Sequence, residues 1–186
     1  MPLPRSPAAD RLRRATWLAM AAMTSFFIAM TYAYLERHGL AARWFSSALG
    51  LVLTINTCLL VASSLALERA REFLRLRRVA GVLRWLATAL TFGLAFLAGQ
   101  AFAWWTLFRT GVYLAGHPDS GFFFLVTAAH AAHLLLALAL LAWTFSRAWR
   151  GRLVPDRPLL LDLTAIFWHM LDLTWIYLWL VLLFYR

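Results

Sequence analysis

Four ionisable side chains lie inside long apolar stretches of the sequence, where their types and spacing could support chemistry. His130 and His133 are three residues apart in one stretch, and His169 and Asp172 repeat that spacing in another. Residues three apart project from nearly the same face of a helix. Each pair would therefore share a face, and the two pairs could meet across a helix interface. Ionisable groups at membrane depth are costly and commonly functional.

Metal or heme binding is the first chemistry that these residues suggest. Three histidines and one carboxylate satisfy the ligand count of a transition-metal site. His130 or His133, paired with His169 on a facing helix, could ligate a six-coordinate heme as in a cytochrome b. Di-metal carboxylate bundles use several glutamates, whereas the glutamates of this chain lie near the ends of the apolar stretches. They are Glu36, Glu68 and Glu72.

The alternative is a structural role, in which these polar groups hydrogen-bond one another and backbone carbonyls and so fix the orientation of the helices. Such contacts contribute about 0.6–2 kcal/mol each. Other polar residues in the apolar stretches could take part: Asn56, Ser63, Ser64, Gln100 and Thr127. We favour the structural role and expect no metal or cofactor in this chain, although the spacing leaves the cytochrome b open.

Enzymatic activity of the chain on its own is not expected. The sequence has no nucleophile elbow, phosphate loop, zinc-protease helix or Gly-rich dinucleotide motif. A transporter with Asp172 as a proton relay is a third alternative, but the broken helices and paired halves of such proteins are missing.

The elements that must position these residues are membrane-spanning helices. Of the 186 residues, 63% are hydrophobic, which exceeds what a soluble domain of this size could bury. A spanning helix needs roughly 20 apolar residues, and five stretches reach that length without the alternation of barrel strands. They are Ala15–Leu35, Ser46–Leu67, Trp85–Phe108, Ser120–Ser146 and Leu163–Tyr185. We predict an all-α membrane protein with a bundle of five transmembrane helices.

The charge distribution predicts the orientation of this bundle. The 18 basic residues are all arginine, and most lie in the N-terminal segment and in the second and fourth connectors. Those segments contain Arg5, Arg11, Arg13, Arg14, Arg69, Arg71, Arg75, Arg77, Arg78, Arg84, Arg147, Arg150, Arg152 and Arg157. The positive-inside rule then places the N-terminus in the cytoplasm and the C-terminus in the periplasm. Basic loops of this kind meet anionic headgroups, and no nucleic-acid partner is expected.

The chain organisation that follows is simple. Residues 1–14 form a basic cytoplasmic segment, and residues 15–186 form one five-helix domain. The second connector, Glu68–Arg84, has the pattern of helix extensions or of a short surface helix. Trp168 and Trp175 share the face of the last helix that carries Asp172, so this face is predicted to be buried. A ladder of small residues predicts close helix approach: Ala95, Gly99 and Ala103.

Several segments resemble subunit III of the heme-copper terminal oxidases, in the five-helix bacterial form. Phe122–His133 is similar to that family's aromatic-rich Thr and His-x-x-His motif. Phe167–Tyr177 is similar to its last-helix motif with His-x-x-Asp-x-x-Trp. The other similar segments are Asn56-Thr57, Ser63-Ser64 and Gly99–Trp105. The resemblance extends over residues 15–185. One departure concerns the Ser-Glu pair that is common in the first helix of this family. At the corresponding position, this chain has about Ala22-Met23, so the acidic residue is missing.

The resemblance implies an accessory core subunit of a respiratory oxidase such as cytochrome c oxidase, located in the bacterial inner membrane. The partner subunit I would hold heme and copper, reduce oxygen and translocate protons. This chain would have no redox centre, would stabilise subunit I and would bind phospholipid. Its structural and lipid-contacting polar centre would consist of His130, His133, His169, Asp172, Trp168, Trp175, Asn56, Ser63 and Ser64. An alternative within the superfamily is a homologue that serves a nitric oxide reductase.

Overall fold

Long helices account for nearly all of the described structure. The computed structural model describes residues 7–38, 47–109, 111, 118–153 and 159–184. Within these residues it contains five helices, each long and apolar enough to cross a membrane. They are α1 (Pro7–His38), α2 (Ser47–Arg75), α3 (Val79–Arg109), α4 (Pro118–Trp149) and α5 (Leu159–Phe184). The predicted all-α architecture is confirmed.

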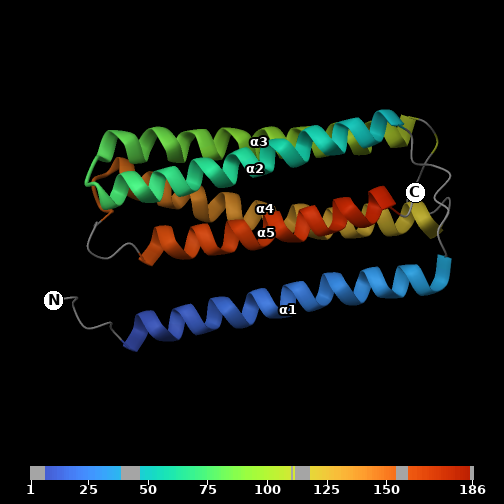
Figure 1. The fold of residues 1–186 in the computed structure, drawn as a ribbon, viewed down its shortest axis with the longest axis horizontal. Coiled ribbons are helices and arrows are strands. Elements are labelled where there is room, and N and C mark those ends of the chain that lie inside the picture. Colours follow the sequence, from blue (N-terminus) through green and yellow to red (C-terminus); the bar gives the residue numbers. More distant parts are fainter. Residues whose placement is uncertain (1–6, 39–46, 110, 112–117, 154–158, 185–186) are drawn as a thin grey trace.

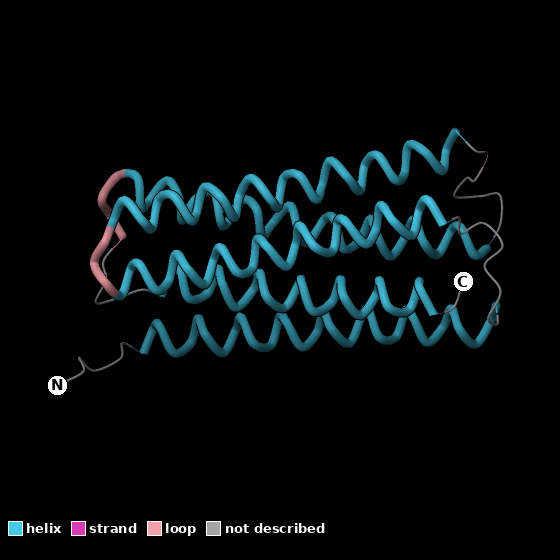
Figure 2. The backbone as a smooth tube through the Cα atoms, turned by 45° about the horizontal axis from the view of Figure 1, so that its top comes forward, coloured by secondary structure: helices cyan, strands magenta, loops and turns pink. Residues whose placement is uncertain are grey.

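The helices run alternately up and down, so that consecutive helices are antiparallel (Figure 1). The start of α1, the turn between α2 and α3, and the end of α4 lie at one end of the bundle. Figure 2 shows the described loop segments together at this end. Three arginine-rich parts of the sequence therefore share one end of the molecule, as the charge pattern predicted.

The helices are longer than the apolar stretches that predicted them. Helix α1 begins at Pro7 rather than near Ala15, because proline is compatible with the first turn of a helix. Arg11, Arg13 and Arg14 therefore belong to α1, while residues 1–6 lie outside the described part. Of the two alternatives for the second connector, helix extension is confirmed: α2 continues to Arg75 and α3 starts at Val79.

A tight turn joins α2 to α3. The amide of Arg78 donates to the Phe73 carbonyl and the amide of Arg77 donates to the Leu74 carbonyl, each at 3.0 Å. This pattern is a Schellman motif, which ends a helix with one residue in the left-handed region. That residue is Arg77, with a φ of 56°. Because the turn is so short, α2 and α3 lie side by side over their length (Figure 1).

The interior of the bundle is filled by large side chains from all five helices. Trp168 and Trp175 of α5 are fully buried, as are Phe27 of α1, Phe96 of α3 and Phe123 of α4. The predicted burial of the α5 face with Asp172 is thereby confirmed, since Asp172 is 5% exposed. Helix α1 packs against α4 and α5, and it lies on the side of the bundle away from α2 and α3 (Figure 1).

Candidate functional site

A row of polar side chains lies where α2 packs against α5. Ser64, Glu68 and Arg71 follow one another at intervals of four and three residues on α2, and such spacing places them on one face of a helix. The α5 residues that they contact lie on one face of that helix for the same reason. The polar seam, as we call it, consists of Ser64, Glu68, Arg71, Asp162, His169 and Asp172.

The inner part of the polar seam is centred on His169. Its Nδ1 is 2.8 Å from Ser64 Oγ, and its Nε2 donates to Glu68 Oε1 at 2.7 Å. Ser64 Oγ donates to Asp172 Oδ2. A chain of hydrogen bonds therefore links Asp172, through Ser64 and His169, to Glu68, and it crosses between the two helices at each of these contacts.

The outer part of the polar seam is ionic. Arg71 Nη1 donates to Glu68 Oε1 at 2.7 Å, and Arg71 Nη2 donates to Asp162 Oδ1 at 2.9 Å. The Arg71 and Asp162 side chains are each 21% exposed, so this pair is shielded from water more than a typical surface ion pair. Arg71 thus connects the glutamate of its own helix to the aspartate of α5 at the arginine-rich end of the bundle.

These contacts decide what the polar seam can do chemically. Both ring nitrogens of His169 have hydrogen-bond partners, so neither is available to ligate heme or another metal in this arrangement. In the described part of the chain, no group of three or more His, Cys, Asp and Glu side chains is placed to hold a metal ion. The arrangement of the polar seam instead fixes α2 against α5 with directional contacts.

The His-x-x-His motif of α4 faces different neighbours. His130 is fully buried, and its ring packs on Trp175 with a centroid distance of 5.0 Å. His133 is partly buried; its Nδ1 lies 2.7 Å from the Ala129 carbonyl oxygen, and its ring packs against Phe27. In the described contacts, the pair His130 and His133 therefore does not meet the pair His169 and Asp172, although His130 reaches α5 at Trp175. Asp172 and His169 turn to α2 instead.

The remaining residues of the predicted polar centre lie at other helix contacts. Ser63 Oγ donates to the Ala89 carbonyl of α3 at 2.8 Å, and Trp175 Nε1 donates to Thr57 Oγ1 at 3.1 Å. Asn56 is buried beside Gly99, and Trp168 is buried beside Gly93. Thr127 accepts from Trp104 Nε1 at 3.0 Å and so joins α4 to α3.

Some buried polar atoms have no hydrogen-bond partner among the described residues. They are Thr24 Oγ1, Asn56 Nδ2, Gln100 Nε2 and Oε1, His130 Nδ1 and Nε2, Trp168 Nε1 and Asp172 Oδ1. A buried polar group without a partner costs about 1–3 kcal/mol relative to a paired one. One of these atoms, Asp172 Oδ1, belongs to the polar seam, and the others lie outside it.

Three residues of the polar seam were not among the sequence-based candidates: Glu68, Arg71 and Asp162. The sequence pattern places Glu68 and Arg71 in a connector, because charged residues commonly mark the end of a membrane-spanning stretch. Their spacing from Ser64 could have identified these two residues, because steps of four and three residues continue along the same face of a helix. Asp162 precedes His169 by seven residues, two helical turns, and could have been found in the same way.

The resemblance to subunit III leads us to expect a first-helix glutamate at about Met23, and the side chain at this position is apolar. Met23 is 7% exposed and lies one turn before Phe27, on the buried face of α1. Phe27 in turn contacts the rings of His130 and His133, with centroid distances of 6.3 and 5.9 Å. At this level, therefore, the contact of α1 with α4 is made by apolar and aromatic groups.

Comparison with known proteins agrees with this architecture. The family model described as Cytochrome c oxidase subunit III matches residues 15–186. The chain is 28% identical over 130 residues to cytochrome c oxidase subunit 3 of Corynebacterium diphtheriae, covering 70% of this chain and 63% of that protein. It is 27% identical over 154 residues to the subunit 3 of Thermostichus vulcanus, covering 81% and 75% respectively.

The matched segment amounts to 63 or 64% of the length of the first three relatives, so this chain spans somewhat less than two thirds of those proteins. The family match and the five apolar helices together indicate a multi-pass membrane protein. Because that match runs through 15–186, the chain belongs to the cytochrome c oxidase subunit III family.

Proposed function

We propose that this chain is an accessory core subunit of a respiratory heme-copper terminal oxidase, a cytochrome c oxidase. It packs beside the catalytic subunit I, stabilises that subunit and holds phospholipid against it. Oxygen reduction and proton translocation take place in subunit I, with its heme and copper. The chain has no redox centre of its own and lies in the bacterial inner membrane with the arginine-rich end of its bundle in the cytoplasm.

The polar seam is the observation that carries the structural part of this proposal. His169 uses both ring nitrogens on Ser64 and Glu68, so this histidine of the polar seam is satisfied within the chain. Groups that serve as redox ligands need an open nitrogen or oxygen atom. The polar seam is therefore suited to holding α2 and α5 in register, which gives the subunit a rigid body for assembly.

The outer surface supports a role in assembly and lipid binding. Every helix exposes large apolar side chains, among them Leu18, Leu65, Leu94, Leu136 and Leu173, each more than half exposed in the isolated chain. In a membrane such surfaces are covered by acyl chains or by other helices. Interfaces between membrane helices form by close packing of this kind of surface.

Removal of the chain from its native host tests this proposal. Membranes that lack it should still contain an oxidase that reduces oxygen, because the redox centres lie in subunit I. The purified oxidase should melt at a lower temperature and retain less phospholipid than the intact complex. Normal heme and copper content with no oxygen reduction would contradict the proposal, and so would an oxidase with unchanged stability and lipid content.

A further inference from the structure

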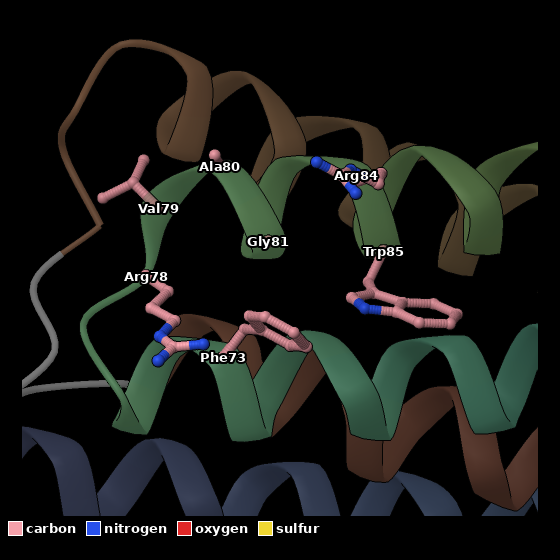
Figure 3. Close-up of a pocket in the computed structure, with 7 residues that line it drawn as sticks. All are labelled: Phe73, Arg78, Val79, Ala80, Gly81, Arg84 and Trp85. Carbon is pink, nitrogen blue, oxygen red and sulfur yellow. The ribbon is translucent and has the colours of Figure 1, made fainter.

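A cavity of about 380 Å³ lies beside the turn between α2 and α3, at the arginine-rich end of the bundle. Figure 3 shows the seven residues that line it: Phe73 from the end of α2, Arg78 from the turn, and Val79, Ala80, Gly81, Arg84 and Trp85 from the start of α3. We refer to it as the turn pocket. Two arginines and two aromatic residues therefore contribute to the lining of one concave surface.

The arginines of the turn pocket differ in their pairing from Arg69 and Arg71. Arg69 pairs with Glu72, and Arg71 pairs with Glu68 and Asp162. Within the residues that the structure describes, no carboxylate forms an ion pair with Arg78 or Arg84. Guanidinium groups without a carboxylate partner are suited to bind a phosphate group.

The backbone of the turn pocket adds to this preference for anions. The Arg78 carbonyl accepts hydrogen bonds from the amides of Gly81 and Val82, which makes Arg78 the residue that precedes α3. The first amides of a helix have no partner within it and favour an anion placed nearby. Val79 and Ala80, which follow Arg78, both line the cavity.

The walls of the turn pocket are apolar and aromatic. Trp85 projects from α3 toward α2, and the Arg78 side chain lies beside the Phe73 ring (Figure 3). Gly81 allows the start of α3 to lie close to the Phe73 ring of α2, because a Cβ at this position would lie 2.0 Å from Cδ1 of Phe73. A ligand that fits must therefore combine a phosphate with an apolar part, at the end of two membrane-spanning helices where headgroups lie.

We propose that the turn pocket binds one anionic phospholipid, with its phosphate on Arg78 and Arg84 and its glycerol and upper acyl chains against Phe73 and Trp85. The inference rests on the lipid binding proposed above and assigns it a site. Basic pockets between membrane helices on the cytoplasmic side are suited to anionic headgroups.

The test uses the detergent-purified complex that contains this chain, with phosphatidylglycerol as the probe. The variant Arg78→Gln/Arg84→Gln removes both guanidinium groups, and Arg150→Gln/Arg152→Gln is the matched control with the same loss of charge at the same end. The affinity for phosphatidylglycerol should fall about thirtyfold in the pocket variant, as expected for two basic residues at an anionic surface. The control should bind like the wild type.

A second measurement does not depend on how the arginine variants fold. Phosphatidylglycerol with brominated acyl chains should quench the fluorescence of Trp85. This contribution is the part of the quenching that the variant Trp85→Phe lacks. Brominated phosphatidylcholine should quench Trp85 much less. Equal binding by the pocket and control variants, equal quenching by both lipids, or displacement of the lipid by inorganic phosphate alone would overturn the proposal. Continued association with subunit I in that case would leave the accessory role intact.

Discussion

At the residue scale, the partly buried His169 and the fully buried His130 show how two histidines of one bundle can have opposite roles. His169 is hydrogen-bonded through both nitrogens to Ser64 and Glu68, so it links two helices. His130 has neither nitrogen paired among the described residues, and its contacts are with Phe27, Phe96 and Trp175. Its ring therefore acts as an aromatic filler of the core.

These environments predict different responses to the same substitution. His169→Leu should destabilise the subunit by about 1–3 kcal/mol, because Glu68 and Ser64 lose a partner in a partly buried site. His130→Leu should cost less than about 1.5 kcal/mol, since it removes aromatic contacts but no hydrogen bond. Thermal denaturation of the complex in mild detergent measures both. An equal or larger effect at His130 would show that its nitrogens have partners in the membrane.

At the scale of elements, glycines of α3 set how closely the neighbouring helices approach. A Cβ at Gly99 would lie 2.1 Å from Asn56 Oδ1 of α2, and one at Gly93 would lie 2.7 Å from the Trp168 ring of α5. The ladder of small residues that the sequence suggested is therefore at least in part an internal contact. It faces α2 at Gly99, and Ala103 is buried as well.

The Gly99 contact can be tested by a suppressor. Gly99→Ala should destabilise the subunit by about 1–3 kcal/mol, because the added methyl group overlaps Asn56 in a packed interior. The double variant Gly99→Ala/Asn56→Ala should recover part of this loss by removing the overlapping amide. Melting temperatures of the two single variants and the double variant decide the point. Strictly additive effects would mean that the two residues do not touch.

The turn between α2 and α3 contains an arginine where glycine is usual. Arg77 has a φ of 56°, whereas the corresponding residue after α4 is Gly151, with a φ of 65°. Arg77→Gly should be more stable than Arg77→Ala by about 1 kcal/mol, because both lose the same charge and only alanine keeps a Cβ in the left-handed region. The same melting temperature for both variants would indicate that the turn relaxes.

The five helices could be predicted from the sequence because long apolar stretches have few alternatives in a membrane. The helix ends could not, since α2 includes Glu68, Arg71 and Arg75 after its apolar part ends. For the same reason, only part of the candidate site could be predicted from the sequence. His169 and Asp172 were identified as polar groups in an apolar helix, but their partners carry charge and resemble connector residues.

At the scale of the whole molecule, the bundle has one strongly basic end. Most of the described arginines lie in the last turns of α2, the turn to α3, the first turns of α3, and the end of α4 with the turn that follows. These segments lie together at the end where α1 starts (Figure 1). By the positive-inside rule we expect this end to face the cytoplasm.

Reporter fusions test that orientation. Alkaline phosphatase fused after Arg109, at the far end of α3, should be active because it reaches the periplasm. The same reporter fused after Arg75, at the basic end of α2, should be inactive. The reverse pattern would place the arginine-rich end outside and would also remove the turn pocket from the cytoplasmic leaflet.

The most direct test of the accessory role is to purify the tagged chain from its native membrane in mild detergent. The co-eluting proteins are then identified by mass spectrometry, and the visible spectrum is recorded before and after this chain is separated from them. We predict co-elution of a heme-copper subunit I, with the heme bands remaining entirely in the fraction that contains subunit I. A heme band that stays with this chain alone, or purification without any heme-copper partner, would contradict the account.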